Sequence, residues 1–159
     1  MIRQVHAEDW KRLRDARLRA LAEAPYAFLS KLADERAFPE EVWRSRAAAR
    51  DTSASFAVEQ DDRFDGIVSC FFADAPGTAY LVAMWVSPKC RGAGLGRRLV
   101  EAVVDWARAH GAARVVLSVE RGNAGAFRLY ERCGFTPRDP PPALPYDPGA
   151  GCDVMVLDL

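Results

Sequence analysis

Hydrophobic positions over the first third of the chain recur mostly with the spacing of an α-helix. Residues 2–5 alternate between apolar and polar and favour a short opening strand. After Asp9, an apolar stripe bordered by basic residues predicts an amphipathic helix whose members are Trp10, Leu13, Ala16, Leu18 and Leu21. Pro25 ends or restarts that helix. A further helix is expected to begin at Pro39, because a proline followed by two glutamates suits the first turn of a helix.

The period then changes to that of β-strands. Residues 55–58 and 66–72 are predicted strands joined by a turn at 61–63, and a second turn falls at 75–77. The run AYLVAMWV over residues 79–86 is apolar at almost every position, which is typical of a central strand covered on both faces. Pro88 ends this run.

The second half of the chain alternates helices and strands. Residues 95–110 and 123–132 carry apolar positions at helical spacing, and Gly111 suits the left-handed position that ends the first of these helices. Residues 115–119 and 154–157 are predicted strands. Five prolines between 140 and 148 indicate a turn-rich loop inserted before the last strand. This order predicts an α/β fold in which a central mixed sheet has helices on both faces.

Composition and charge narrow the class of protein. The 159 residues suffice for one compact domain, so residues 1–159 are read as a single domain. Basic and acidic side chains both number 22, and zero net charge argues against the basic surface of a nucleic-acid-binding domain. No apolar stretch approaches the roughly 20 residues of a membrane span, and the N-terminus lacks the apolar core of a signal peptide. Four separated cysteines and two histidines make a poor metal set. We therefore expect a cytoplasmic protein with no metal, no membrane partner and no nucleic-acid partner.

One turn carries candidate chemistry. Residues 86–97 (VSPKCRGAGLGR) join the central strand to the clearest helix, and Gly92, Gly94 and Gly96 let the backbone turn tightly and approach a ligand. The free N–H groups of the first helical turn then favour an anion such as phosphate. A Walker loop would end in Gly-Lys-Ser/Thr, which this turn lacks, and a dinucleotide fingerprint would place its third glycine one residue later.

Two motifs in this order resemble one family. Residues 91–96 (RGAGLG), preceded by Val86-Ser87-Pro88, match the Arg/Gln-x-x-Gly-x-Gly/Ala signature of the GCN5-related N-acetyltransferases, or GNATs. About thirty residues later, Asn123, Ala126, Leu129-Tyr130 and Gly134-Phe135 match the second block of that family. Together the blocks cover about a third of the chain, and the surrounding run resembles actinobacterial-type GNATs of unassigned substrate.

The resemblance implies a fold, a donor and a reaction. The fold would be the GNAT sheet, splayed between its fourth and fifth strands so that coenzyme A enters the split. The reaction would move an acetyl group from acetyl-CoA to a primary amine by direct attack in a ternary complex, with CoA as product. Positions that match the family's cofactor site are Met84, Trp85, Val86, Arg91, Gly92, Ala93, Gly94, Leu95, Gly96, Arg97, Asn123, Ala126 and Tyr130. A homodimer is common in the family, and the sequence leaves monomer and homodimer open.

The same resemblance assigns catalytic candidates. Tyr130 would protonate the departing thiolate, and the main-chain N–H of Val86 would stabilise the oxyanion. The base is less defined, because Tyr80 stands where many relatives carry a glutamate. Glu120 is the nearest alternative in sequence, Asp74 and Asp153 are weaker candidates, and a water relay is equally compatible.

The acceptor site is expected around the first two helices and the loop before the last strand. Candidate substrate-binding residues are Tyr26, Phe28, Tyr80 and Tyr146. Nearby acids (Asp34, Glu35, Asp139, Asp147 and Asp153) would suit a cationic amine, or simply belong to a solvated surface. The hypothesis is a small-molecule amine; the alternatives are a protein or peptide acceptor and a non-catalytic acyl-CoA-binding or sensing domain.

Overall fold

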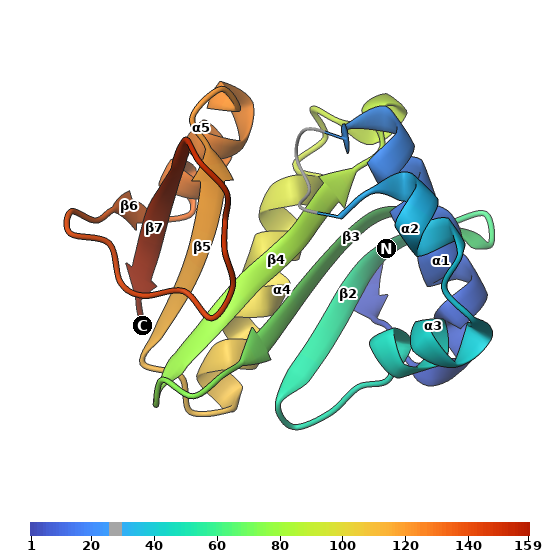
Figure 1. The fold of residues 1–159 in the computed structure, drawn as a ribbon, viewed down its shortest axis with the longest axis horizontal. Helices are drawn as coiled ribbons and strands as arrows, with labels where there is room; N and C mark the ends of the chain where they lie inside the picture. Colours follow the sequence, from blue (N-terminus) through green and yellow to red (C-terminus); the bar gives the residue numbers. More distant parts are fainter. Residues whose placement is uncertain (26–29) are drawn as a thin grey trace.

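The computed structural model describes residues 1–25 and 30–159 as a mixed sheet between two sets of helices (Figure 1). In these ranges the sheet has seven strands in the order β1-β2-β3-β4-β5-β7-β6. The strands are β1 (Ile2–Gln4), β2 (Ser53–Gln60), β3 (Arg63–Phe72), β4 (Thr78–Val86), β5 (Arg114–Glu120), β6 (Thr136–Pro137) and β7 (Cys152–Asp158). The helices are α1 (Trp10–Glu23), α2 (Leu32–Arg36), α3 (Glu40–Ala47), α4 (Leu95–Ala109) and α5 (Ala124–Arg132), with short 3-10 turns η1 (Ala7–Asp9) and η3 (Pro88–Cys90). None of the helices in the described ranges is long and apolar enough to cross a membrane.

The expected strands are present, with longer bounds at β2 and β3. The turn between them has only two residues, since Arg63 already pairs with Gln60 across the hairpin. Asp61 and Asp62 have φ values of 48° and 62°, which is the left-handed geometry of a tight two-residue hairpin turn. The sequence did not predict α2, because five residues are too few to establish a helical period.

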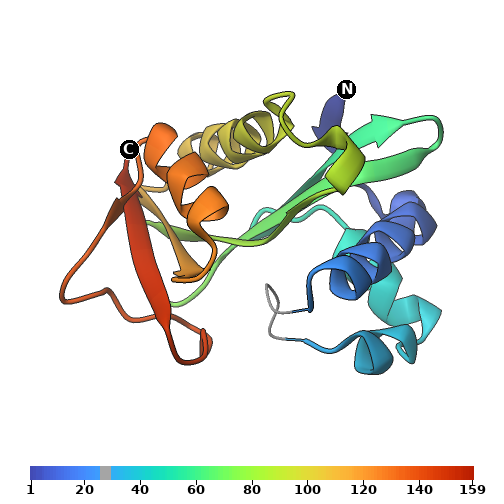
Figure 2. The same ribbon diagram turned by 90° about the horizontal axis from the view of Figure 1, so that it is seen from above.

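Different helices cover the two faces of the sheet (Figure 2). On one face, Leu99, Val100 and Val103 of α4 are fully buried against β2 to β5. On the opposite face, α1 packs Leu13 and Ala16 over the β1–β3 end of the sheet. The apolar stripes of the sequence therefore sort into two separate cores, one on each side of the sheet, as the expected fold class requires.

The proline-rich loop covers the part of the sheet that α1 and α3 do not reach. A small third core joins Tyr80, Val116 and Val156, and Leu144 of the loop packs against it. This segment therefore covers the β5–β7 half of the sheet, consistent with an insertion before the last strand.

β4 and β5 separate along most of their length. They run parallel and pair over three residues only, from Thr78 opposite Arg114 to Tyr80 opposite Val116. β5 continues to pair with β7 as far as Glu120. In the part of the chain that the structure describes, residues 81–86 and 117–120 have no pairing with each other across this gap. The splay expected between the fourth and fifth strands is confirmed.

A bulge interrupts β4 where it has left β5. Ile67 of β3 pairs with Trp85, but Ser69, two residues further on, pairs with Val82, so β4 carries one extra residue. Ala83 in this bulge has a φ of 57°, which is unusual for a residue with a Cβ atom. Strained backbone of this kind concentrates at functional sites, so both sides of this strand are candidates for chemistry.

Candidate functional site

The glycine turn after β4 leaves the start of α4 open. Gly92 and Gly94 have φ values of 84° and 78°, and a Cβ atom at either position would meet nothing within 4 Å. Gly94 is the N-cap residue, and no side chain caps the helix. The first N–H groups of α4 therefore face open space with the positive end of the helix dipole behind them, which is the arrangement that binds phosphate.

Gly96 has a different role in the same turn. A Cβ atom there would lie 3.1 Å from Cδ2 of Leu129 in α5, tighter than ordinary packing. The missing side chain thus lets the start of α4 approach α5 closely. The two sequence motifs, about thirty residues apart, meet at this contact.

Asn123 begins α5, and its side-chain oxygen accepts a hydrogen bond of 3.2 Å from the Ala126 N–H. This is the usual N-cap interaction, so the expected contact with a pantetheine arm is not the only use of the side chain. The cap employs the amide oxygen and leaves the amide nitrogen as the group that can donate to a ligand.

Tyr130 lies on α5 and is 5% exposed, with its ring centroid 6.0 Å from that of Phe135. Burial raises its pKa well above the usual range, and the nearby Tyr146 raises it further. The phenol therefore keeps its proton at neutral pH and remains a hydrogen-bond donor. From the proline-rich loop, the Tyr146 hydroxyl lies 3.2 Å from the Ser118 hydroxyl on β5. The structure thus brings two of the candidate tyrosines together beside the separated strands.

Tyr80, where the resemblance implies a glutamate in many relatives, lies where the split begins. The candidate bases Glu120 and Asp153 lie on β5 and β7. Tyr80 is 2% exposed and packs against Phe71 at 5.5 Å between ring centroids, at the last paired position before β4 and β5 part. Glu120 is exposed at the end of β5. Asp153 is held in an ion pair with Arg121 at 3.0 Å. No three histidine, cysteine, aspartate or glutamate side chains of the described residues are grouped as metal ligands.

Sequence reasoning missed a carboxylate that connects α1 to the glycine turn. Glu23 accepts hydrogen bonds from the Trp85 indole at 3.1 Å and from the Arg91 guanidinium at 2.9 Å. The hydrogen bond from Arg91 lowers the pKa of Glu23 below its ordinary value. Arg91 also donates to the Val86 carbonyl at 3.0 Å, so its side chain stabilises the turn rather than standing free. The Trp85 side chain is buried on the α1 face, which leaves only its main chain for a ligand in the split.

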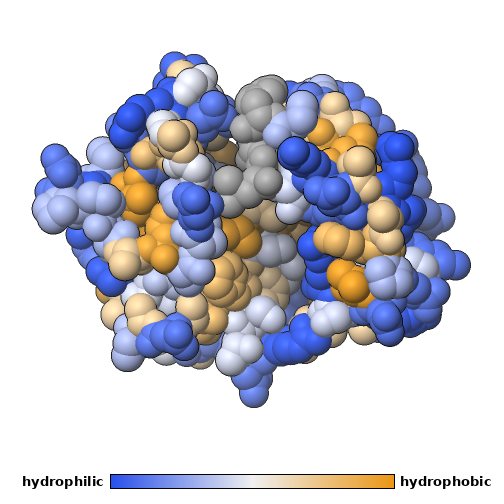
Figure 3. Space-filling model, viewed as in Figure 1, coloured by the Kyte–Doolittle hydropathy of each residue, from blue (hydrophilic) through white to orange (hydrophobic). Residues whose placement is uncertain are grey.

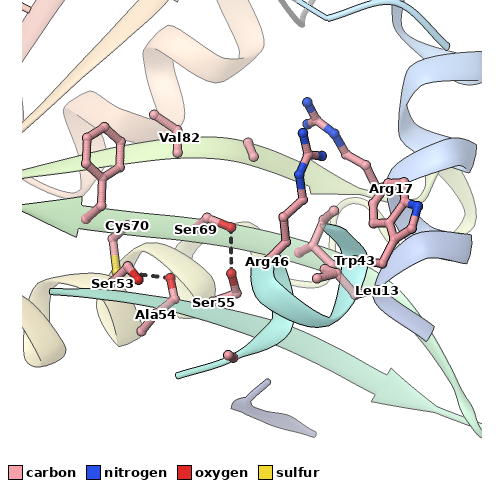
Figure 4. Close-up of a pocket in the computed structure, with 14 residues that line it drawn as sticks. Leu13, Arg17, Trp43, Arg46, Ser53, Ala54, Ser55, Ser69, Cys70 and Val82 are labelled. Atoms are coloured by element: carbon pink, nitrogen blue, oxygen red, sulfur yellow. Dashed lines mark hydrogen bonds between the residues drawn. The ribbon is translucent and has the colours of Figure 1, made fainter. Parts of the chain in front are cut away.

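The opposite face of β4 is hollowed. Figure 3 shows an apolar floor in the middle of the face that looks away from α4, with polar surface around it. A cavity of about 280 Å³ lies on this side between α3 and the sheet, and both Val82 and Ala83 of the bulge line it. Its charged lining residues in the described part of the chain are Arg17 and Arg46, which point over the strands (Figure 4).

The expectation that acidic side chains surround the acceptor site is wrong for Glu35. Glu35 is fully buried behind the cavity, where it accepts two hydrogen bonds from Arg17 at 3.0 Å each and one from Arg46 at 2.8 Å. Burial alone would raise the pKa of Glu35, but these arginines hold the pKa below its ordinary value. The carboxylate is therefore deprotonated, and the arginines compensate its negative charge. Asp147 is also engaged, accepting from the Gly149 N–H at 2.9 Å.

The remaining acidic candidates lie on the surface. Asp34 and Asp139 are exposed to solvent. The two expected acceptor residues Tyr26 and Phe28 lie outside the described residues.

Comparison with known proteins defines the class. Residues 10–135 match the Acetyltransferase (GNAT) family. The GNAT domain of Streptomyces lividans PAT superposes with a TM-score of 0.79 at 18% identity, covering 99% of this chain and 89% of that chain. The yncA acetyltransferase of Salmonella typhimurium, solved with acetyl-CoA, superposes with a TM-score of 0.76 at 23% identity over 99% of this chain and 92% of its own. The fold is therefore the one that these GNAT acetyltransferases share.

The chain belongs to the GNAT acetyltransferase family. Among curated proteins, it is similar to mycothiol acetyltransferase of Beutenbergia cavernae, with 36% identity over 121 residues, or 75% of this chain and 38% of that protein. It is also similar to mycothiol acetyltransferase of Thermomonospora curvata, with 35% identity over 74% of this chain and 37% of that protein. The chain thus spans less than two fifths of the length of these relatives.

Proposed function

We propose that the protein is an acetyl-CoA-dependent N-acetyltransferase that modifies the primary amine of a small molecule by direct attack in a ternary complex. The observation that carries the proposal is the split between β4 and β5 beside an uncapped, glycine-lined start of α4. Solved neighbours of the same fold bind acetyl-CoA or coenzyme A, which supports this use of the split.

The chain offers matching groups along the length of such a donor. The N–H groups of residues 92–97 would hold the pyrophosphate, and the unpaired edge of β4 at Met84 and Val86 would hold the pantetheine arm. The amide nitrogen of Asn123 and the α5 surface at Ala126 would complete this side. Bound acetyl-CoA would supply a thioester whose carbon–sulfur bond is replaced by a carbon–nitrogen bond, so the amine must lose one proton and the sulfur must gain one.

Tyr130 fits the role of proton donor to the sulfur. Its hydroxyl carries a proton at neutral pH, and its side chain belongs to the same core cluster as Leu117 and Val119 of β5. The Val86 N–H would stabilise the oxyanion, since β4 presents its main chain at this position without a neighbouring strand on the β5 side.

Removal of the amine proton is assigned to a water relay. Tyr80 is a buried phenol tilted against Phe71, at the position where the resemblance implies a glutamate in many relatives. Glu120 lies exposed at the far end of β5. A relay would pass the proton to solvent without a dedicated carboxylate. If Glu120 were the base instead, Glu120→Gln would lower kcat at neutral pH by about 10²-fold or more.

Thermal unfolding with acetyl-CoA tests the donor. At about 100 times Kd, a ligand that binds only the folded state adds roughly 2.7 kcal/mol of stability. For a chain of this length the expected rise in Tm is about 5–11 °C. Acetyl-CoA and CoA should both produce the shift, and NAD and ATP should not. No shift at saturating acetyl-CoA would overturn the proposal.

A peptide acceptor is the second candidate. N-alpha-acetyltransferase 30 of Schizosaccharomyces pombe is 34% identical over 84 residues, or 51% of this chain and 56% of that protein. Competition decides between the two acceptors: with acetyl-CoA bound, N-terminal peptides should not inhibit acetylation of small amines if the first proposal holds. Binding of acetyl-CoA without turnover on either class would favour a sensing domain.

A further inference from the structure

The cavity on the α3 side of β4 has a positive wall. Arg17 and Arg46 are the charged residues among its described lining, and the carboxylate that partners them, Glu35, is buried behind them rather than facing the cavity. Two guanidinium groups against one carboxylate leave one net positive charge. The Arg46 side chain is 38% exposed, so its charge is open to a ligand that enters the cavity. A positive wall of this kind favours a negatively charged ligand.

Arg46 retains donors for such a ligand. One of its terminal nitrogens donates to Glu35 at 2.8 Å, and in the described part of the chain its Nε and other terminal nitrogen donate to no protein acceptor. Its guanidinium is packed over the rings of Phe38 and Trp43, at 4.8 and 5.2 Å from their centroids, which fixes its plane. A guanidinium with a fixed plane and spare N–H groups matches the bidentate geometry of a carboxylate.

The floor of the cavity reaches the strand that would hold the donor. Val82 and Ala83 line it from the bulge of β4, beyond the point where β4 leaves β5. The hydroxyls of Ser55 and Ser69, 2.7 Å apart, add polar groups to the lining of the same cavity. A molecule whose amine lies at β4 can therefore extend an anionic group toward Arg46.

We infer that the acceptor is an amine that also carries a carboxylate, that is, an amino acid, bound through Arg46 with Arg17 and Glu35 behind it. This inference rests on the proposed function and assigns its substrate class. A single carboxylate matches the single net positive charge of the arginine wall, whereas a phosphate monoester would bring about one additional negative charge.

The test compares each common L-amino acid with its own C-terminal amide as acetyl acceptor, by release of free CoA thiol. The two members share the same amine and side chain and differ in the negative charge. The amine of the amide is less basic and more often unprotonated, so the comparison is biased against the inference. For the best acceptor we expect kcat/KM to be at least 100-fold higher for the acid than for the amide, mainly through KM.

Three variants locate that preference. Arg46→Gln should reduce the acid-to-amide ratio below about tenfold, and Arg46→Lys should retain an intermediate ratio because it keeps the charge without the fork. Arg44→Gln is the matched control, since Arg44 is on the same helix and pairs at the surface with Glu40. It should leave the ratio unchanged.

Binding is measured separately from turnover. With the protein saturated with CoA, calorimetry should detect the best amino acid and not its amide, and Arg46→Gln should weaken this binding at least tenfold.

Several outcomes would overturn the inference while acetyl-CoA still stabilises the protein. They are equal or better turnover of the amides, no turnover of any amino acid, a preference for phosphoethanolamine over β-alanine, and equal behaviour of Arg46→Gln and Arg44→Gln. Failure of acetyl-CoA to raise Tm would instead overturn the proposed function itself.

Discussion

The two sides of β4 present different chemical groups, main-chain groups on one side and charged side chains on the other. The side toward α4 relies on main-chain groups: glycines at positive φ, an uncapped helix start and the edge of a strand without a partner on one side. The side toward α1 and α3 relies on charged side chains from separate helices, held around a buried glutamate. A main-chain site can serve any sequence that folds this way, while a side-chain site carries the selectivity of one protein.

The largest expected effect comes from removing one oxygen atom, the hydroxyl of Tyr130. Tyr130→Phe should lower kcat by about 10²–10⁴-fold with little change in acetyl-CoA affinity, since in the proposed mechanism the phenol protonates the departing sulfur and does not hold the donor. Single-turnover assays and calorimetry with acetyl-CoA would separate the two effects. Tyr146→Phe, which loses the contact with Ser118, is the matched control and should lower kcat by less than tenfold. Wild-type turnover in Tyr130→Phe would remove this residue from the mechanism.

Among the stability variants, the largest loss is expected on the side of β4 that faces α1 and α3. Glu35→Gln removes the buried carboxylate that pairs with Arg17 and Arg46, and should cost about 2–3 kcal/mol in urea unfolding at pH 7. The surface variant Glu40→Gln should change stability by less than about 0.5 kcal/mol, because its pair with Arg44 is exposed.

The pH dependence of the same variant gives an independent check. The pKa of Glu35 lies below its unfolded value of 4.5, so its contribution to stability is present above about pH 4.5 and is lost as pH falls through the folded value. The stability difference between wild type and Glu35→Gln should therefore shrink on acidification below pH 4.5. A difference that stays constant down to pH 2 would mean that charge pairing at Glu35 is not what holds α2 and α3 to α1.

The smallest effect distinguishes a ligand-binding glycine from one that only permits a turn. Gly94 and Gly111 both have positive φ and open space where a Cβ atom would lie. Alanine at either position should cost about 1 kcal/mol of stability through backbone strain. Only Gly94→Ala should also weaken acetyl-CoA binding, by about tenfold in Kd from calorimetry. Equal Kd values for the two variants would show that the turn does not contact the donor.

The sequence predicts the two sides of β4 to different extents, because the residues that build them are separated by different distances along the chain. The glycine turn and the Asn123–Tyr130 block are contiguous motifs, and Gly111 at φ 85° ends α4 as its position indicated. The splay of the sheet came from resemblance and is confirmed by the pairing of β4 and β5.

The cluster of Arg17, Glu35 and Arg46 on the other side of β4 could not be predicted from local motifs. Arg17 lies 18 residues before Glu35, and Arg46 lies 11 residues after it, on three different helices. In the sequence each arginine is indistinguishable from a solvated residue on an amphipathic helix. The link between Glu23 and Arg91 spans 68 residues, and nothing in either local segment indicates it. Charge pairs of this kind depend on how helices pack, so they become visible only in three dimensions.

The extra residue at Ala83 has a consequence for the whole end of β4. Side chains along a strand alternate between its faces, so an inserted residue reverses the alternation for every position beyond it. Trp85 reaches Glu23 on the α1 side, and Met84 and Val86 pack toward α4, only because the alternation is shifted by one. Deleting Ala83 would keep the composition of the strand almost unchanged yet exchange its inside and outside. One alanine with a positive φ thus determines which side chains at the end of β4 face α4 and which face α1.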